Sequence, residues 1–575
     1  MKGNKKDVIR LLETIALYME IKGENPFKIA AFRKAASALE TDERSIAEID
    51  DFTAIPGIGK GTSSVINEFL ETGTSRVLEQ LKEEIPETLL TLLRLPGLGG
   101  KKIAKLYQEL GVVDMATLKE ACLAQKVQKL PGFGKKTEEK LLAAIEESGA
   151  RPERLPLAAV LPIATEIEEQ LKTMKGIIRF SRAGSLRRMK ETVKDLDFII
   201  ATNDPQLVRE QLLQLNHISN VIASGDTKVS LQLSYEYDIA VDFRLVTEEQ
   251  FATTLHHFTG SKEHNVRMRQ LAKERGEKIS EYGVENGKTG EIKTFPSEQA
   301  FFAYFQLPFI PPELREDGTE VDRYRDDYPL LHLSHIQGDL HMHSAWSDGA
   351  CSIEEMAEAC RKRGYRYMAI TDHSQYLKVA NGLTVERLKR QREEIERLNA
   401  KYDDFTILAG VEMDILPDGT LDYDDEVLAE LDFVIAAIHS SFSQPRDVIM
   451  KRLTAALRNR YVDVIAHPTG RLIGRRDGYD VDIDMLIELA RETDTVLELN
   501  ANPNRLDLSY VYLKKAQDAG VKIAINTDAH HLDMLEDMEI GVAAARKGWI
   551  RKDTVINTWT LEELRHFLRR KRSTK

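Results

Sequence analysis

Three aspartates in two strand-like stretches could hold divalent metal ions for phosphoryl transfer. Asp195 and Asp197 alternate in one strand, so their side chains point to one face while Leu196 points into the core. A second strand, 237–244, could place Asp242 beside them. Carboxylates that share a face are costly without a cation, and they suit Mg²⁺ or Mn²⁺. Three such ligands fit a two-metal centre that activates a 3′-hydroxyl and neutralises a leaving pyrophosphate.

Upstream of these aspartates lies a segment that could bind a triphosphate. Gly184 and Ser185 offer backbone amides and a hydroxyl, and Arg188 offers a guanidinium. An Asp-x-Asp pair alone is most often a solvated strand face. The Gly-Ser-x-x-Arg segment at this spacing favours the catalytic interpretation.

The second half of the chain holds nine further potential metal ligands, and nearly all of them follow a hydrophobic run. They therefore lie at the carboxyl ends of predicted strands, where barrel active sites assemble. Imidazole with carboxylate suits Zn²⁺, Mn²⁺ or Fe²⁺, and nine ligands suffice for two or three ions, which could generate hydroxide and clamp a phosphodiester. The nine are His341, His343, Asp348, His373, Glu412, His439, His467, Asp528 and His530.

A short glycine pattern recurs three times in the first 150 residues. It reads Ile-Pro-Gly-Ile-Gly at 55–59, Leu-Pro-Gly-Leu-Gly at 95–99 and Leu-Pro-Gly-Phe-Gly at 130–134, each time before a predicted helix. Such turns leave backbone N–H groups free to bind DNA phosphate without reading sequence. The glycines concerned are Gly57, Gly59, Gly97, Gly99, Gly132 and Gly134.

The charge distribution is compatible with DNA binding although the whole chain is acidic. The net charge is -13, but residues 93–140 hold ten Lys or Arg against five Asp or Glu, a local charge of +5. The three cysteines, Cys122, Cys351 and Cys360, form no metal-binding pair or disulfide framework. No apolar run approaches the roughly 18 residues of a membrane span. We expect a cytoplasmic protein without membrane contact.

At 575 residues the chain should contain roughly three to five structural units. Residues 1 to about 150 have helical periodicity, 155–245 hold short strands between helices, and 307–336 are rich in proline and charge. After this segment, apolar strands alternate with helices, which is typical of a parallel α/β unit.

The segment 183–200 resembles the nucleotidyltransferase palm of family X DNA polymerases, and the likeness extends over residues 1 to about 315. It implies that Asp195, Asp197 and Asp242 are catalytic metal ligands, with Ser185 and Arg188 on the triphosphate. It also implies a thumb segment that contacts the incoming nucleotide. The thumb residues are His257, Phe258, Gly260, Asn265 and Arg269.

Two positions depart from the family pattern. Where lyase-active members carry a Schiff-base lysine after the first hairpin, this chain has Val65, and a neighbouring lysine position is Gly61. Valine cannot form an imine, which argues against that lyase chemistry. The usual Tyr-Phe pair is His257-Phe258, which leaves sugar discrimination open.

Residues 336 to about 570 resemble the polymerase-and-histidinol-phosphatase (PHP) superfamily, a distorted seven-stranded relative of the (β/α)₈ barrel. All nine ligand positions of that pattern are present, and Arg471 could contact phosphate or be a solvated helix residue. Together the resemblances imply an all-α helix-hairpin-helix region, an α+β palm and thumb, and a (β/α)₇ barrel. The expected units are a lyase-like region 1–88, fingers-like 89–150, palm 151–245, thumb 246–315, linker 316–335 and PHP barrel 336–575.

The leading hypothesis is a repair or gap-filling DNA polymerase whose barrel is a 3′-5′ exonuclease or an abasic-site nuclease. Its expected partners are DNA and deoxynucleoside triphosphates (dNTPs), with Mg²⁺ or Mn²⁺ in the palm, and we expect a monomer. A histidinol-phosphate-type phosphatase fused to a DNA-binding module is the alternative. A DNA-binding scaffold without catalysis is the third, and twelve candidate metal ligands disfavour it.

Overall fold

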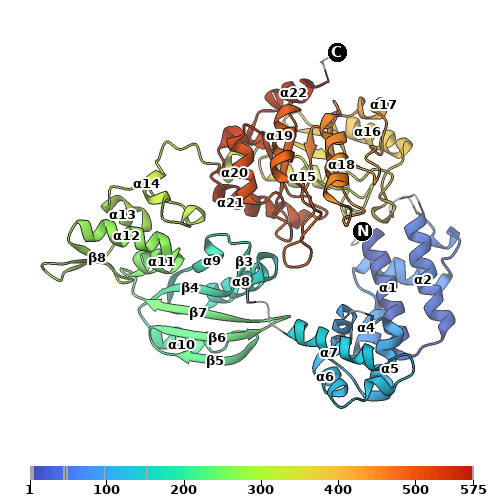
Figure 1. Cartoon of the computed structure of the whole chain (residues 1–575), viewed down its shortest axis with the longest axis horizontal. Coiled ribbons are helices and arrows are strands. Elements are labelled where there is room, and N and C mark those ends of the chain that lie inside the picture. Colours follow the sequence, from blue (N-terminus) through green and yellow to red (C-terminus); the bar gives the residue numbers. More distant parts are fainter. Residues whose placement is uncertain are drawn as a thin grey trace.

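The computed structural model describes residues 5–42, 44, 46, 49–95, 97–149 and 153–572 of the chain. A helical region is followed by a five-stranded mixed sheet, a mainly helical unit and a seven-stranded parallel sheet (Figure 1). The expected order of an all-α region, an α+β unit and a β/α barrel is thereby confirmed.

Apolar residues at three and four spacing bury one face of each N-terminal helix, as Val8, Leu12 and Ile15 do in the first. In all three glycine patterns the next helix begins directly after the second glycine. The helices are α1 (Lys5–Lys22), α2 (Pro26–Thr41), α3 (Lys60–Thr72), α4 (Arg76–Glu84), α5 (Gly100–Leu110), α6 (Met115–Leu123) and α7 (Lys135–Gly149).

The palm sheet has the strand order β2-β4-β7-β6-β5, in which β4 and β7 are parallel neighbours. Leu196, Phe198 and Ile200 pack in the main core with α8 and α10, whereas Ile199 and Ala201 pack against α11 on the other face. The palm elements are β1 (Leu155–Pro156), α8 (Leu157–Thr173), β2 (Ile177–Arg182), α9 (Gly184–Arg187), β3 (Thr192–Val193), β4 (Asp195–Thr202), α10 (Pro205–Leu212), β5 (Ile218–Ser224), β6 (Lys228–Ser234) and β7 (Asp238–Val246).

The thumb continues from β7 and is joined to the barrel by a packed segment. Within 316–335, Val321, Leu330 and Leu331 are buried, and Glu320 contacts His264 of the thumb. The elements are α11 (Phe251–Thr259), α12 (Lys262–Glu274), β8 (Glu277–Ile279), β9 (Val284–Asn286), β10 (Ile292–Lys293), α13 (Glu298–Tyr304), η5 (Pro312–Leu314), α14 (Glu320–Arg323) and η6 (Leu333–His335).

The C-terminal strands β11 to β17 are parallel and follow one another in sequence order around the sheet. A parallel bridge between Met342 and Ala529 brings the first and last strands together, so the barrel is nearly closed. Its strands are β11 (Gly338–Asp339), β12 (Tyr367–Ile370), β13 (Thr406–Asp414), β14 (Phe433–Ala437), β15 (Val464–Ile465), β16 (Val496–Asn500) and β17 (Ile523–Asn526). Its helices are η7 (Lys378–Ala380), α15 (Ile353–Lys362), α16 (Val385–Asn399), α17 (Asp425–Leu428), α18 (Arg446–Arg458), α19 (Ile483–Glu492), α20 (Tyr510–Asp518), η8 (Leu532–Glu536), α21 (Asp537–Lys547) and α22 (Leu561–Arg569).

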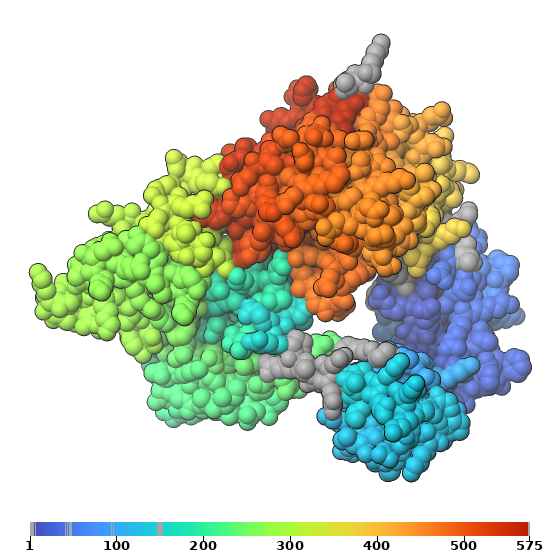
Figure 2. All heavy atoms as spheres, in the orientation of Figure 1, coloured from blue at the N-terminus to red at the C-terminus, as the bar shows by residue number. Residues whose placement is uncertain are grey.

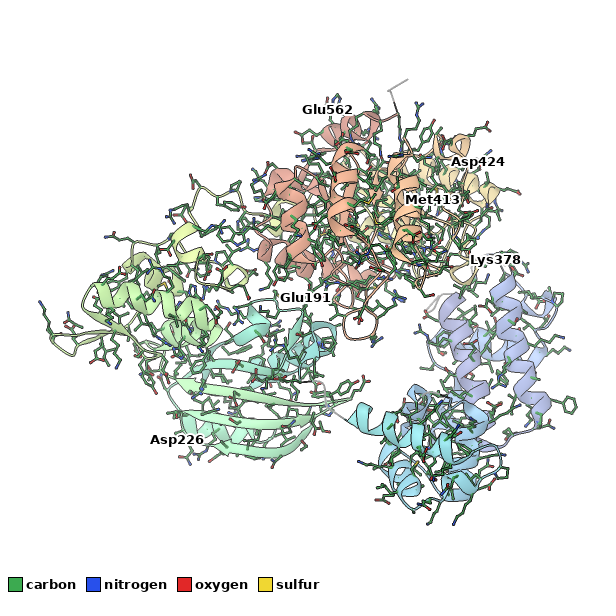
Figure 3. The ribbon with its side chains drawn as sticks, in the orientation of Figure 1. Glu191, Asp226, Lys378, Met413, Asp424 and Glu562 are labelled. Atoms are coloured by element: carbon green, nitrogen blue, oxygen red, sulfur yellow. The ribbon has the colours of Figure 1, made fainter. Side chains whose placement is uncertain are left out.

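Loops at the carboxyl edge of the barrel contact the other units. Helix η7, after β12, contacts α1 and α2, and Lys5 donates to Asn381. The loop after β15 reaches the palm, where Arg471 pairs with Glu191. Figure 3 labels Glu191 at the junction of palm and barrel and Lys378 beside the N-terminal helices. Within the described residues, the model contains no helix that is both long and apolar enough to span a membrane.

Candidate active sites

The three palm aspartates meet at the start of the parallel β4–β7 pair. Asp197 stands opposite Asp242 in the register, and Asp195 stands opposite Ala240. Asp195 is exposed, and the other two are half-buried. The face that carries them is the one that α9 and α11 approach. The fold therefore brings together the three predicted ligands from two strands about 40 residues apart.

The electrostatics of this cluster favour a bound cation. Burial raises the pKa of Asp197 to about 7, and the carboxylates of Asp195 and Asp242 add to the shift. On the other side, Asp242 accepts a hydrogen bond from Ser230 Oγ at 2.6 Å and pairs with Lys228 Nζ at 2.8 Å. Ser230 and Lys228 thus hold one carboxylate in place, while no comparable ion pair to Asp197 is found among the described residues. Three oxygen-donor carboxylates on one face fit Mg²⁺ or Mn²⁺.

The predicted triphosphate segment lies directly against the aspartates. Gly184 has a positive φ of 60°, and a Cβ at that position would collide with Asp197 Oδ2. Ser185 is half-buried in α9. Arg188, at the end of α9, donates to the carbonyl oxygen of Thr259 and lies 3.3 Å from Glu316 Oε1.

Of the predicted thumb residues, Gly260 and Phe258 lie against palm residues, whereas His257 and Asn265 contact each other within the thumb. A Cβ on Gly260 would approach Arg188 Nη1 to 3.1 Å. Phe258 lies under the guanidinium of Arg244, 4.5 Å from ring centroid to Cζ. Asn265 Nδ2 donates to the carbonyl of His257 at 2.8 Å, and burial lowers the pKa of His257. Arg269 is exposed on α12.

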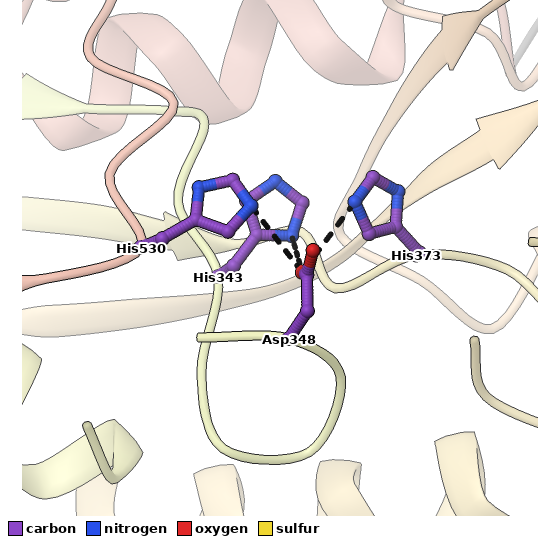
Figure 4. Close-up of side chains that lie close together, drawn as sticks. All are labelled: His343, Asp348, His373 and His530. Carbon is purple, nitrogen blue, oxygen red and sulfur yellow. Dashed lines mark ion pairs between the residues drawn. The ribbon is translucent and has the colours of Figure 1, made fainter. Parts of the chain in front are cut away.

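Eight of the nine predicted barrel ligands form three overlapping clusters in which ligand atoms lie within 4.8 Å of one another. The ninth, His467, lies 2.8 Å from Glu412 Oε1 through its Nε2. Figure 4 shows one cluster, in which three imidazoles surround the carboxylate of Asp348. The clusters are His343, Asp348, His373 and His530; His341, His343, Glu412 and Asp528; and His373, Glu412 and His439.

The donor set of the barrel fits two or three transition-metal ions. Buried nitrogens of four predicted ligands have no hydrogen-bond partner among the described residues: His341 Nε2, His343 Nδ1, His373 Nδ1 and His467 Nδ1. Burial would lower the pKa of His439, but Glu412 and Asp414 raise it to about 10. In contrast, burial and the neighbours His530 and His373 lower the pKa of His343 to about 3. Imidazole nitrogens that lie beside carboxylates without a hydrogen bond are what Zn²⁺, Mn²⁺ or Fe²⁺ would bind.

Two acidic residues that we did not predict support the ligands. Glu498 on β16 is fully buried and lies 2.9 Å from His341 Nδ1. Asp414, at the end of β13, lies 3.2 Å from His439 Nδ1. Carboxylates in this position fix the tautomer and orientation of a metal-binding histidine. Glu498 lies in the middle of its strand, after only Val496 and Leu497, so it lacks the longer hydrophobic run that marks the predicted ligands.

The glycines of the three hairpins have the conformations that the pattern requires. Gly57, Gly97 and Gly132 have φ values of 115°, 80° and 90°. Gly59, Gly99 and Gly134 have nothing within 4 Å of an added Cβ, so the backbone at the start of each second helix is open to a phosphate. The glycines at 97, 99, 132 and 134 and the lysines at 101, 126, 129, 135, 136 and 140 are exposed.

Two further residues singled out in the sequence, Val65 and Arg471, contact other parts of the protein. Val65 is buried in the helical core with 6% of its surface exposed, which leaves no amine at the position of the lyase lysine. Arg471 makes a bidentate pair with Glu191, at 2.7 and 3.1 Å, and donates to the carbonyls of Arg505 and Leu506. Arg471 therefore contacts the palm. The sequence had suggested either a phosphate contact or a solvated helix residue, and neither expectation included this ion pair.

Family models match four parts of the chain. A helix-hairpin-helix domain matches residues 3–75, and a SAM-like helix-hairpin-helix tandem matches 89–147. A DNA polymerase beta thumb matches 254–316, and a PHP domain matches 339–502.

Curated relatives match either part of the chain or nearly all of it. A probable phosphatase of Thermoanaerobacter sp. (strain X514) is 30% identical over 246 residues, which are 41% of this chain and 95% of that protein. One of Caldanaerobacter subterraneus subsp. tengcongensis is 28% identical over 247 residues, 41% of this chain and 91% of that protein. The DNA polymerase/3′-5′ exonuclease PolX of Bacillus subtilis (strain 168) is 67% identical over 567 residues, 99% of this chain and all of that protein. The chain belongs to the family of this bacterial DNA polymerase/3′-5′ exonuclease PolX.

Proposed function

We propose that this chain is a DNA-directed DNA polymerase that fills gaps during DNA repair and removes 3′ nucleotides with its PHP barrel. One observation carries the proposal: three candidate palm ligands and nine candidate barrel ligands are gathered into two sites of one polypeptide. Either set alone would support one half of the function.

In the palm, Asp195, Asp197 and Asp242 would hold Mg²⁺ or Mn²⁺. The bound ions would help the 3′-hydroxyl attack the α-phosphate and would neutralise the leaving pyrophosphate. The chain itself binds and orients the nucleotide. Ser185 and Arg188 are proposed to bind the triphosphate, while Phe258 and Asn265 face the nascent base pair.

In the barrel, the nine ligands would hold two or three ions of Mn²⁺, Zn²⁺ or Fe²⁺. These ions would activate water and neutralise charge on the scissile phosphodiester. Glu498 and Asp414 orient His341 and His439. Because imidazole is a poor ligand for hard cations, we expect Mn²⁺ to support DNA degradation better than Mg²⁺.

The units surround one opening that DNA could enter. Figure 2 shows an open space bounded by the helical region in blue, the palm in teal and the barrel in orange. The loops at the ligand-bearing edge of the barrel contact both the palm and the N-terminal helices. The hairpins would hold the DNA backbone with little regard for its sequence.

A gapped primer-template tests the proposal. With dNTPs and Mn²⁺ the purified chain should extend the primer to the end of the gap, and without dNTPs it should shorten the primer from its 3′ end. Failure to extend under any metal condition would contradict the polymerase function. An abasic-site substrate in the same assay shows whether the barrel also cuts at such sites.

A small-molecule phosphatase is the second candidate, because the probable phosphatases are matched over nearly their whole length by 41% of this chain. Histidinol phosphate separates the two possibilities. The gap-filling function predicts slow release of phosphate from it and fast release of nucleotides from DNA. The phosphatase function predicts the reverse.

A further inference from the structure

The carboxylate of Glu316 joins the proposed nucleotide site to the PHP barrel. It forms ion pairs with Arg188 and Lys190 of the palm and with Lys547 in the last turn of α21 in the barrel. Lys547 Nζ also donates to the carbonyl oxygen of Arg188 at 3.3 Å. A barrel residue therefore touches both the backbone and the ion-pair partner of the arginine that is proposed to bind triphosphate.

Lys547 and Arg188 lie on the enclosed side of this contact. Their side chains are 1% and 12% exposed, whereas those of Glu316 and Lys190 are 25% and 32% exposed. The ring of Tyr510 lies 5.3 Å from Lys547 Nζ, and Ser261 Oγ donates to the Glu316 carbonyl at 2.6 Å. Solvent screens a buried charge such as that of Lys547 less than an exposed one, so removing it changes how strongly the remaining partners interact.

Three cations share one carboxylate in this cluster. Burial would raise the pKa of Glu316, but Lys547 and Lys190 hold it below its usual range, so Glu316 is ionised. An ionised Glu316 attracts Arg188 away from an incoming triphosphate. Lys547 offsets this attraction because it neutralises the same carboxylate from the barrel side.

We infer that Lys547 is a positioning residue of the polymerase reaction: it keeps Glu316 neutralised so that Arg188 can turn to the triphosphate. The barrel thus contributes to nucleotide affinity in the palm through its own lysine. This inference rests on the proposed function, in which Arg188 binds the triphosphate. It adds a residue from the barrel to that site.

The test measures KM and kcat for dNTP during gap filling by the full-length chain. Lys547→Met should raise KM by about tenfold, the effect of one charge-assisted contact, and change kcat by less than about twofold. Lys547→Arg, which keeps the charge, should stay near the wild-type KM. Lys362→Met provides the matched control, since Lys362 is an exposed lysine at the end of another barrel helix, α15.

A double-mutant cycle isolates the role of Glu316. If Glu316 competes for Arg188, Glu316→Gln with Lys547→Met should return KM to near the wild-type value. This pair variant removes both charges, so it also serves if Lys547→Met alone does not fold; its KM should then equal that of Glu316→Gln. A higher KM in the pair variant than in Glu316→Gln would overturn the inference.

Arg188→Lys separates failure of the inference from failure of the proposed function. If Arg188→Lys raises KM while Lys547→Met leaves it unchanged, the nucleotide site stands and the role of Lys547 is wrong. If Arg188→Lys leaves KM unchanged, the proposed triphosphate contact is wrong and the inference falls with it. 3′-5′ exonuclease activity, measured on the same preparations, reports whether the barrel has kept its fold.

Discussion

Gly184 lies so close to Asp197 that any side chain at position 184 would displace the Asp197 carboxylate. A Cβ at Gly184 would collide with Asp197 Oδ2, and the positive φ of 60° disfavours any side chain there. Gly184→Ala should therefore displace the carboxylate and lower primer extension by about 100-fold, the usual cost of a small misplacement in an active site. Steady-state extension of a gapped primer measures this effect.

The control for this substitution is Gly225→Ala. Gly225 lies in the turn between β5 and β6, has no positive φ, and its Cβ would meet only the Lys228 carbonyl, at an ordinary 3.6 Å. The Gly225→Ala variant should retain full primer-extension activity. If Gly184→Ala extends primers as the wild type does, Asp197 does not have to occupy its observed position.

A substitution of Glu498 tests whether this residue supports a metal ligand in the barrel. Its contact with His341 Nδ1 orients a metal ligand, so Glu498→Gln should reduce exonuclease activity by about 10- to 100-fold and lower the bound metal content. Glu492→Gln, on the exposed side of α19, should change neither. Elemental analysis and nucleotide release measure the two effects, and normal values for Glu498→Gln would rule out this supporting role.

Residues with distinctive chemistry were predictable from the sequence, whereas their supports were not. The spacing of Asp195 and Asp197 predicted a shared strand face, and the position of His373 after a hydrophobic run predicted a strand end. Glu498 has no such run before it and acts through His341, which lies 157 positions away and becomes a neighbour only when the barrel forms. Arg471 could not be assigned because its partner, Glu191, belongs to a different unit.

The hairpin is the element that carries the proposed DNA binding. Gly99→Ala with Gly134→Ala should weaken binding of gapped DNAs of unrelated sequence to a similar extent and flatten the salt dependence. At these two glycines a Cβ meets no protein atom, and φ lies outside the left-handed region, so the fold should be retained. Gly97 and Gly132 are less suitable, because their φ values of 80° and 90° would strain a side chain.

Binding isotherms at several salt concentrations measure this effect, and Gly225→Ala again serves as the control. A loss confined to one DNA sequence would show that the hairpins read bases rather than phosphates. Unchanged binding would place the DNA contact elsewhere.

Elements with strong periodicity were predicted better than exposed ones. The helices before residue 150 and the buried barrel strands have clear patterns, but β5 was not predicted. All seven of its residues are at least partly exposed, so the strand lacks the alternation that would mark it. Its position at the sheet edge explains this, since it pairs only with β6.

At the scale of the whole molecule, the two metal-binding sites are built from separate residues in separate units. The palm triad comes from β4 and β7, and the barrel ligands come from β13 and the segments after five other strands. The units nevertheless touch through Glu191–Arg471 and Glu316–Lys547. These contacts predict that a change in the barrel can affect dNTP affinity, while loss of either metal site leaves the other chemistry intact. The order of the units was predictable from the sequence, but the contacts between them were not, because each joins residues of different units.

The most direct test compares the wild type, Asp197→Ala, and the double variant His341→Ala with His343→Ala on one gapped primer, with and without dNTPs. Asp197→Ala should retain less than about one per cent of extension, since a shared ligand of the palm ions is lost, and should still degrade the primer. The histidine variant should do the reverse: it should extend the primer and no longer shorten it. If the histidine variant degrades primers normally, or if Asp197→Ala still extends them, the assignment of the two activities to these two sites is wrong.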